Sequence, residues 1–315
     1  MTSSPPAAEY AFTEELLLEG CGGPNALYVR DQARGVLGAV HAGAAITADD
    51  AGNLADLLGD RQAFVNEPTE PAHLREESRR HITAALLIHA CRTDDPDLVR
   101  RLRQVAPYEV HRIDLRLPLS VPCLLSLFAG LGQEEPAVRH AAMRMARNLH
   151  RQTDITPILD IVIGELASPE QGRGWRRIAP ADGARGALVG YSLGTTDLDS
   201  LCEQVAAAVD PSAPTQNALR TLAALYTVTG QFDRVTGLVG RASTRAPVIG
   251  GIHDAVCGIA WNLEHGWHVP SAGFPFAEAV TVAEGVATNA GHRKQVEAIR
   301  DRHNRLRVRA GTTAA

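Results

Sequence analysis

Apolar residues recur at helical spacing on both sides of a polar turn, and this pattern repeats along the chain. We take the polar turn residue as the reference point of each copy: Asp50, Asp94, Asp154, Asp197 and Gln231. The residues eight before, four after and eight after each reference point are apolar in every copy, as in the first copy with Ala42, Leu54 and Leu58. Residues four apart share one face of a helix. Each copy therefore predicts a helix, a short turn and a second helix.

The turns carry residues that are typical of helix N-caps. Thr93, Thr153 and Thr196 each stand directly before an aspartate. Their side-chain oxygens can accept a hydrogen bond from a free backbone N–H of the following helix. A single helical hairpin cannot bury its apolar stripe alone, so successive hairpins must stack. The sequence predicts an all-α fold, a superhelical array of stacked αα-hairpins.

Two segments carry a resemblance to known repeat families. The segment 136–149, PAVRHAAMRMARNL, resembles a helix of a HEAT repeat, and the segment 223–233, AALYTVTGQFD, is similar to the turn of a tetratricopeptide repeat. Irregular spacing favours the HEAT or armadillo class, whereas the 34-residue interval between Asp197 and Gln231 matches the tetratricopeptide length. The resemblance covers roughly residues 31 to 243. It implies an α-solenoid that binds another macromolecule on its concave face.

The pattern also predicts a division of the chain. We expect a disordered tail over residues 1–8, the hairpin array over 9–245, a C-terminal helical cap region over 246–309 and a second tail over 310–315. The cap region would contain helices over 276–288 and 292–308. The second of these is basic on most of its surface, and a polar outer face is what a terminal capping helix requires.

Composition narrows the class of protein. The chain has 315 residues, of which 45% are hydrophobic and 21% are charged, as in a globular protein. No uncharged run reaches the ~20 residues that cross a bilayer, and no basic segment leads into an apolar one at the N-terminus. The five cysteines are scattered without a CxxC motif, which favours reduced thiols. We expect a cytoplasmic protein with no membrane contact, and the net charge of −5 argues against a general nucleic-acid binder.

One short motif suggests hydrolase chemistry. Gly190-Tyr-Ser-Leu-Gly194 matches G-x-S-x-G, with Ser192 as the candidate nucleophile. That mechanism needs a strand before the serine within an α/β sheet. The repeat register places Ser192 late in the first helix of a hairpin, so we interpret the motif as small residues at a helix contact.

Histidines and cysteine gather in a second region. His253, Cys257, His265 and His268 could form a four-ligand zinc site if 253–263 is a helix, because the first two would lie one turn apart on one face. Their spacing matches no established zinc module, and a cysteine between Val256 and Ile259 is more often a small core residue. We predict no metal and no cofactor.

Three groups of residues are candidates for binding. The groups are Trp175 with Arg173, Arg176 and Arg177 in a long loop, the aromatic pair Trp261 and Trp267, and Arg144 with Arg147 on a basic helix stripe. Each group also has a plainer interpretation. The first would attach the loop to the body of the protein, the second would belong to the core of the cap, and the third would be a solvated helix face. Tryptophan and arginine dominate binding hot spots.

The sequence thus favours a non-catalytic scaffold that binds a protein or peptide partner. The first alternative is a helical-scaffold enzyme, such as a tailoring cyclase or lyase with a metal dependence, that uses His253, His265 and His268. The second is nucleic-acid binding by a HEAT-like array through Arg144 and Arg147, which would weaken with salt.

Overall fold

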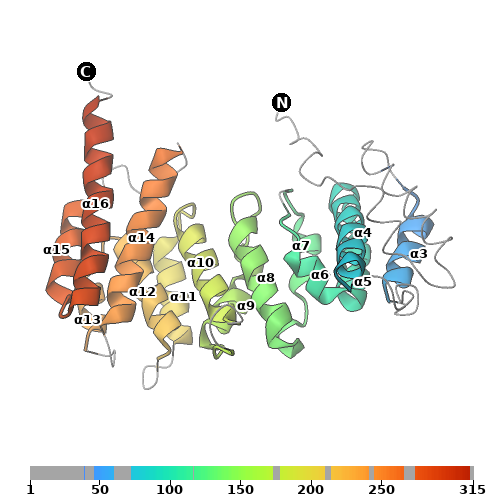
Figure 1. Ribbon diagram of the computed structural model, residues 1–315, viewed down its shortest axis with the longest axis horizontal. Helices are drawn as coiled ribbons and strands as arrows, with labels where there is room; N and C mark the ends of the chain where they lie inside the picture. Colours follow the sequence, from blue (N-terminus) through green and yellow to red (C-terminus); the bar gives the residue numbers. More distant parts are fainter. Residues whose placement is uncertain are drawn as a thin grey trace. The chain divides into compact units, whose positions relative to one another are not determined.

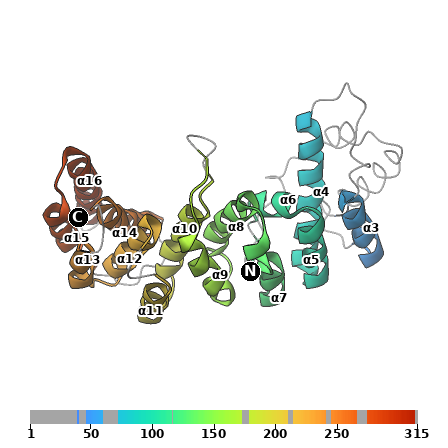
Figure 2. The same ribbon diagram turned by 90° about the horizontal axis from the view of Figure 1, so that it is seen from below.

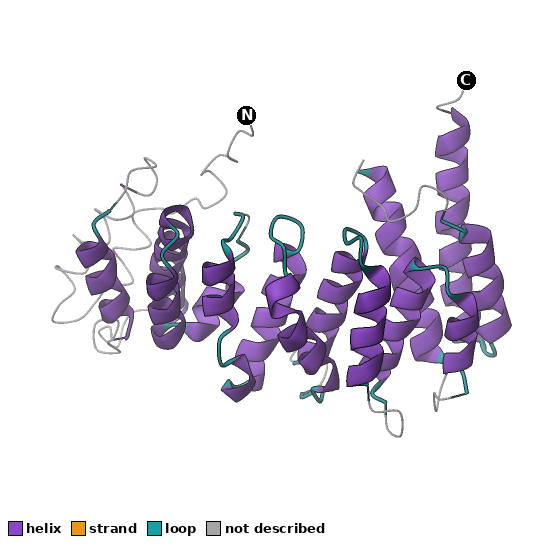
Figure 3. Cartoon of the chain, turned by 180° about the vertical axis from the view of Figure 1, so that it is seen from behind, coloured by secondary structure: helices purple, strands orange, loops and turns teal. Residues whose placement is uncertain are grey.

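In the computed structural model the described residues form a series of α-helices with turns and loops between them (Figure 1). It describes residue 39 and residues 46–59, 72–115, 117–172, 178–209, 214–240, 245–265 and 274–312. Within these ranges every regular element is helical (Figure 3), and the one β-type pairing is an isolated antiparallel bridge between Gln171 and Ile178. The predicted all-α class is confirmed. No helix in the described ranges has both the length and the apolar character needed to cross a bilayer.

Contacts divide the chain into two compact units, which meet in the sequence between Met145 and Ala146. The first unit contains short helices grouped around α5, which contacts α3, α4, α6 and α7. The bounds are α3 Ala48–Gly59, α4 Ala72–Thr93, α5 Pro96–Val105, α6 Pro107–Arg112, α7 Val121–Phe128, the 3-10 turn η3 Leu131–Gln133, and α8 Pro136–Leu149, which runs across the boundary.

Two arginines bond the helices of this first unit. Arg79 on α4 donates to the carbonyl of Leu58 at 2.6 Å and pairs with Glu109 at 3.0 Å. The buried Arg103 on α5 pairs with Glu134 at 3.2 Å and donates to the ring of His111. Each guanidinium thus satisfies polar groups from helices that are distant in the sequence.

The second unit contains two sets of helices, which can be followed in Figure 2. Helices α10, α12, α14 and α16 contact one another in chain order, and the intervening helices contact their sequence neighbours on one side of this row. The bounds are η4 Thr156–Ile158, α9 Leu159–Gly164, η5 Glu165–Ala167, α10 Pro180–Ser192, α11 Leu198–Ala208, α12 Gln216–Val228, α13 Phe232–Leu238, α14 Ala246–Glu264, α15 Phe276–Val286 and α16 Ala290–Thr312.

The turns predicted at Asp94, Asp154, Asp197 and Gln231 are present, whereas the helix predicted before Asp50 lies, apart from residue 39, outside the described residues. The capping residue differs from copy to copy. Asp197 caps α11 by accepting from the backbone N–H of Ser200 at 3.3 Å, as expected. Before α5 the cap is Asp95, because Asp94 adopts a left-handed conformation with φ of 52°. Thr47 takes this role at α3, and Gln231 makes no side-chain cap bond at α13. Apolar spacing therefore locates each turn, whereas local backbone geometry selects the cap.

The predicted C-terminal helices correspond to α15 and α16. Helix α16 extends beyond the predicted end at residue 308 to Thr312. The predicted boundary between array and cap at residue 245 stays a prediction. Helix α14, which begins there, packs against α12 more extensively than any other described pair of helices packs.

Glycine makes this close packing possible. A Cβ atom at Gly251 of α14 would lie 2.4 Å from the carbonyl oxygen of Arg220 and 2.6 Å from the Cβ of Ala223, both on α12. The two helix backbones therefore approach at a distance that no side chain larger than hydrogen permits. Val248 and Ile252, which flank this contact, are fully buried.

We expect Gly251→Ala to destabilise the protein by about 1–3 kcal/mol, because the added methyl group overpacks the α12–α14 contact. The matched control is Gly285→Ala on α15, where a Cβ meets nothing within 4 Å. That change should instead stabilise by about 0.5–1 kcal/mol through helix propensity. Urea unfolding measures both variants, and equal effects would contradict the predicted close contact.

Candidate functional site

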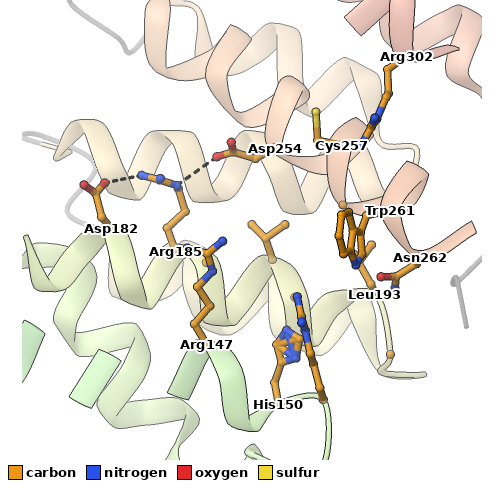
Figure 4. Close-up of a pocket in the computed structure, with 16 residues that line it drawn as sticks. Arg147, His150, Asp182, Arg185, Leu193, Asp254, Cys257, Trp261, Asn262 and Arg302 are labelled. Carbon is orange, nitrogen blue, oxygen red and sulfur yellow. Dashed lines mark hydrogen bonds and ion pairs between the residues drawn. The ribbon is translucent and has the colours of Figure 1, made fainter. Parts of the chain in front are cut away.

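An open cavity of about 780 Å³ lies in the second unit, and we call it the groove (Figure 4). Its lining residues come from the end of α8 and the turn that follows it, from α10, from α14 and from α16. Among them are Arg147, His150, Arg185, Gly190, Asp254, Trp261 and Arg302. The volume is within the range of about 300–1,000 Å³ that is typical of ligand sites.

Three glycines line the groove at intervals of four residues. Gly186 and Gly190 share one face of α10, and Gly194 lies in the turn that follows this helix. A Cβ at Gly190 would come within 1.9 Å of the His150 ring, and one at Gly186 within 2.8 Å of the Arg147 side chain. These two glycines therefore leave room for Arg147 and His150 against α10. Gly194 differs, because a Cβ there meets only the Tyr191 carbonyl, at 3.8 Å.

An ion-pair network lies along the groove beside α14. Asp254 accepts two hydrogen bonds from the guanidinium of Arg220, at 2.8 and 2.7 Å, and pairs with Arg185 at 3.1 Å. Arg185 also donates to Asp182 at 2.6 Å and to Asn217 at 2.7 Å, and Figure 4 shows it between the two aspartates. Both arginines of this network are thus committed to acceptors of the protein itself.

The network fixes charge states at this end of α14. Burial acts to raise the pKa of Asp254, but interactions with His253, Arg220 and Arg185 outweigh it and hold the pKa below its ordinary value. Interaction with Asp254, followed by contact with Cys257, raises the pKa of His253 to about 9 against the effect of burial. Its ring nitrogen Nε2 lies 3.5 Å from the Cys257 sulfur. At neutral pH Asp254 is therefore ionised and His253 is protonated.

This geometry bears on the candidate metal ligands. A histidine binds a metal through a neutral ring nitrogen, so protonation of His253 opposes coordination. His265 directs Nδ1 to the carbonyl oxygen of Trp261 at 2.8 Å, and His268 lies outside the described residues. In the described part of the chain no three histidine, cysteine or acidic side chains are placed to hold an ion.

Trp261 is the most prominent apolar side chain of the groove. It is 43% exposed, and its ring stacks on that of His265 with a centroid distance of 4.0 Å. The stacking orders the indole while leaving much of it open to the groove. A large ordered ring that is only partly covered is a typical anchor for a partner.

Two arginines of the groove lack a close carboxylate. Among the described residues no carboxylate pairs with Arg147, which is exposed at the end of α8. Arg302 of α16 reaches Glu264 only at 3.6 Å, and its buried Nε atom has no hydrogen-bond partner. The neighbouring His150 is uncharged at neutral pH, because burial first, and then the charges of Arg151 and Arg147, lower its pKa to about 4.

The structure brings some of the predicted residues together and separates others. Arg147 and Trp261 both line the groove, whereas Arg144 is exposed on α8 and does not line it. The other predicted binding residues lie outside the described part of the chain: Arg173, Trp175, Arg176, Arg177 and Trp267. Sequence reasoning missed Arg302 and His150, although the α10 glycine row was a visible sign of a close contact there.

The hydrolase-like motif forms no nucleophile elbow. Ser192 is fully buried at the end of α10 and donates to the carbonyl of Val189 at 2.7 Å. A helix, not a strand, precedes it. The interpretation of this motif as a helix contact is therefore confirmed. Comparisons with protein families, with curated proteins and with solved structures find no match to this chain.

The low pKa of His150 predicts a pH dependence of stability. The unfolded chain binds a proton at this histidine near pH 6.5, whereas the folded chain does so only near 4. The stability contributed by neutral His150 is therefore complete above pH 6.5 and is lost as the pH falls from 6.5 to 4. Between pH 7 and pH 5 the wild type should lose about 1–2 kcal/mol more than His150→Gln.

Urea unfolding at intervals of half a pH unit measures this difference. His111, whose pKa burial and Arg103 lower to about 3, remains in both proteins, so both should lose stability in acid. Only the difference between the two curves reports His150. Parallel curves would show that His150 is not held neutral in the fold.

Proposed function

We propose that the protein is a HEAT-like or tetratricopeptide-like α-solenoid and serves as a non-catalytic scaffold. Its partner would be a segment of a protein or peptide that lies in the groove. The ordered contacts from α10 through α12 and α14 to α16 support a repeat architecture. The observation that carries the functional proposal is the ordered and exposed Trp261 in an open cavity.

The form of the cavity favours a polypeptide partner. Scaffolds of stacked helices present extended surfaces, on which a few aromatic and arginine side chains supply most of the binding energy. The groove offers this combination in Trp261, Arg147 and Arg302.

An enzyme that uses the histidines of this region is less well supported. His253 is paired with Asp254 and Cys257, and His265 is engaged with the Trp261 carbonyl. A general base must reach a substrate proton with a ring nitrogen, and both ring nitrogens of His253 are engaged within the protein. We therefore assign the groove to binding.

A blocked groove tests the proposal. Gly194 lines the groove and has room for a side chain, so Gly194→Phe should fill the cavity without strain. We expect random 12-residue peptides displayed on phage to yield binders of the full-length wild type. Synthetic copies of these peptides should bind Gly194→Phe at least about tenfold more weakly, a loss of about 1.4 kcal/mol.

Gly285→Phe provides the matched control, since it adds the same side chain at an open position on α15, outside the groove. This variant should bind like the wild type. Failure of any peptide to enrich, or an equal loss in both variants, would count against a peptide-binding groove.

A further inference from the structure

The groove contains more unsatisfied hydrogen-bond donors than acceptors. Asp182 and Asp254 supply its carboxylates, and both are already bound by arginines of the protein. Arg185 and Arg220 are committed in the same network. An occupant therefore finds few free acceptors on this wall and no uncompensated negative charge from these two groups.

Two other arginines supply donors at the groove: Arg147, and Arg302, whose pairing with Glu264 leaves its Nε atom without a partner. Arg147 has five N–H donors, as every guanidinium does, and no carboxylate among the described residues pairs with it. Contact of its aliphatic stem with Gly186 holds the side chain along the groove wall. Its charge is thus presented to the cavity by the packing of the stem.

Arg302 presents a donor that the fold itself leaves unsatisfied. Its Nε atom is buried and has no hydrogen-bond partner. Another nitrogen of the same guanidinium pairs with Glu264 at 3.6 Å. The Arg302 side chain is 21% exposed, so part of it stays open to an occupant that carries acceptor oxygens, although the Nε atom itself does not.

Trp261 adds an apolar requirement. Figure 4 shows it on the side of the groove where Arg302 and Asn262 also lie, while Arg147 projects from the opposite wall. An occupant of the groove can therefore meet the indole as well as the arginines. A purely polar chain would leave the exposed indole without an apolar contact.

We infer that the partner segment is acidic: its carboxylates pair with Arg147 and Arg302, and an apolar side chain of the segment packs on Trp261. This inference rests on the proposed function, since it names the chemistry of the segment that the groove binds. Arginine pairs with carboxylates through two parallel hydrogen bonds, which gives the contact both strength and direction.

Nucleic acid is the other polyanion that arginines bind, and the groove suits it less well. A nucleic-acid strand carries a phosphate at each nucleotide and is held by many cationic contacts. Of the arginines that line the groove, Arg185 is bound by Asp182 and Asp254, and Arg302 pairs with Glu264 at 3.6 Å. Asp182 and Asp254 line the same cavity. The remaining exposed arginine of the predicted basic stripe, Arg144, does not line it.

The test uses the full-length chain and the peptides selected on phage. Each binder is synthesised with a fluorescent label, together with a counterpart in which every Asp and Glu is replaced by Asn and Gln. Anisotropy titration should show that the counterpart binds at least about tenfold more weakly, because each lost charge-assisted contact is worth about 1.5–3 kcal/mol before solvent screening.

Charge variants locate the contact. Arg147→Glu and Arg302→Gln should each weaken the acidic peptide at least about fivefold, or about 1 kcal/mol. Arg147→Met keeps the stem against Gly186 and removes only the charge, so it should show a smaller loss. Arg144 lies one helical turn from Arg147 on α8 but does not line the groove. Arg144→Glu should therefore change the affinity less than about twofold. Thermal unfolding of each variant excludes loss of the fold as the cause.

The outcomes separate the inference from the proposed function. Enriched peptides without acidic residues, or binding that is indifferent to Arg147→Glu and Arg302→Gln, would overturn the acidic partner and leave the peptide-binding groove intact. No enrichment at all would overturn both. A labelled 20-nucleotide single strand that binds, and that Arg144→Glu and Arg147→Glu weaken equally, would replace the peptide by nucleic acid.

Discussion

The close approach of α12 and α14 is the constraint on which the groove depends. Gly251 allows the two backbones to meet, and one turn later on α14 Asp254 lies opposite Arg220 of α12. Because Asp254 also pairs with Arg185 of α10, a single packing contact places side chains from three helices. The ion pairs supply little stability by themselves, since partly exposed pairs are screened by solvent. Their role is to fix positions and to neutralise charge along one wall.

Small residues explain why Trp261 is distinctive. Only 4% of the chain is aromatic, and the fully buried positions are dominated by alanine, leucine, valine and isoleucine. A core of this kind packs helices closely without large rings. An indole that is ordered by stacking but left 43% exposed therefore adds little to the core. Burial against a partner would recover the free energy of its apolar surface.

The sequence predicts the helices well and the groove only in part. Apolar spacing located the turns near Asp94, Asp154 and Asp197, because burial of one helix face imposes that period. It could not select Asp95 over Asp94 as a cap, since the choice depends on a single backbone dihedral angle. Among the described candidates, Trp261 and Arg147 were identified by residue type, and both line the groove.

The residues that sequence reasoning missed depend on contacts between distant helices. Arg302 stands in a strongly basic helix, where many neighbouring arginines look alike. Only its place in the fold distinguishes it, through a buried Nε atom without an acceptor. Similarly, His253 and Cys257 have the spacing of metal ligands, yet the proximity of Asp254 protonates the imidazole instead. Spacing along a helix identifies which side chains share a face, but it does not show how a neighbouring charge, here that of Asp254 on the same helix, sets their protonation.

Charge along the groove is stable over the physiological pH range for the same reason. His150 is neutral because its burial against α10, and then the charges of Arg151 and Arg147, oppose the gain of a proton. Its pKa is therefore lowered to about 4. His253 is charged because Asp254 lies next to it, and its pKa is about 9. Neither histidine changes its protonation between these values. The contribution of these two histidines to the charge at the groove is thus constant in that interval.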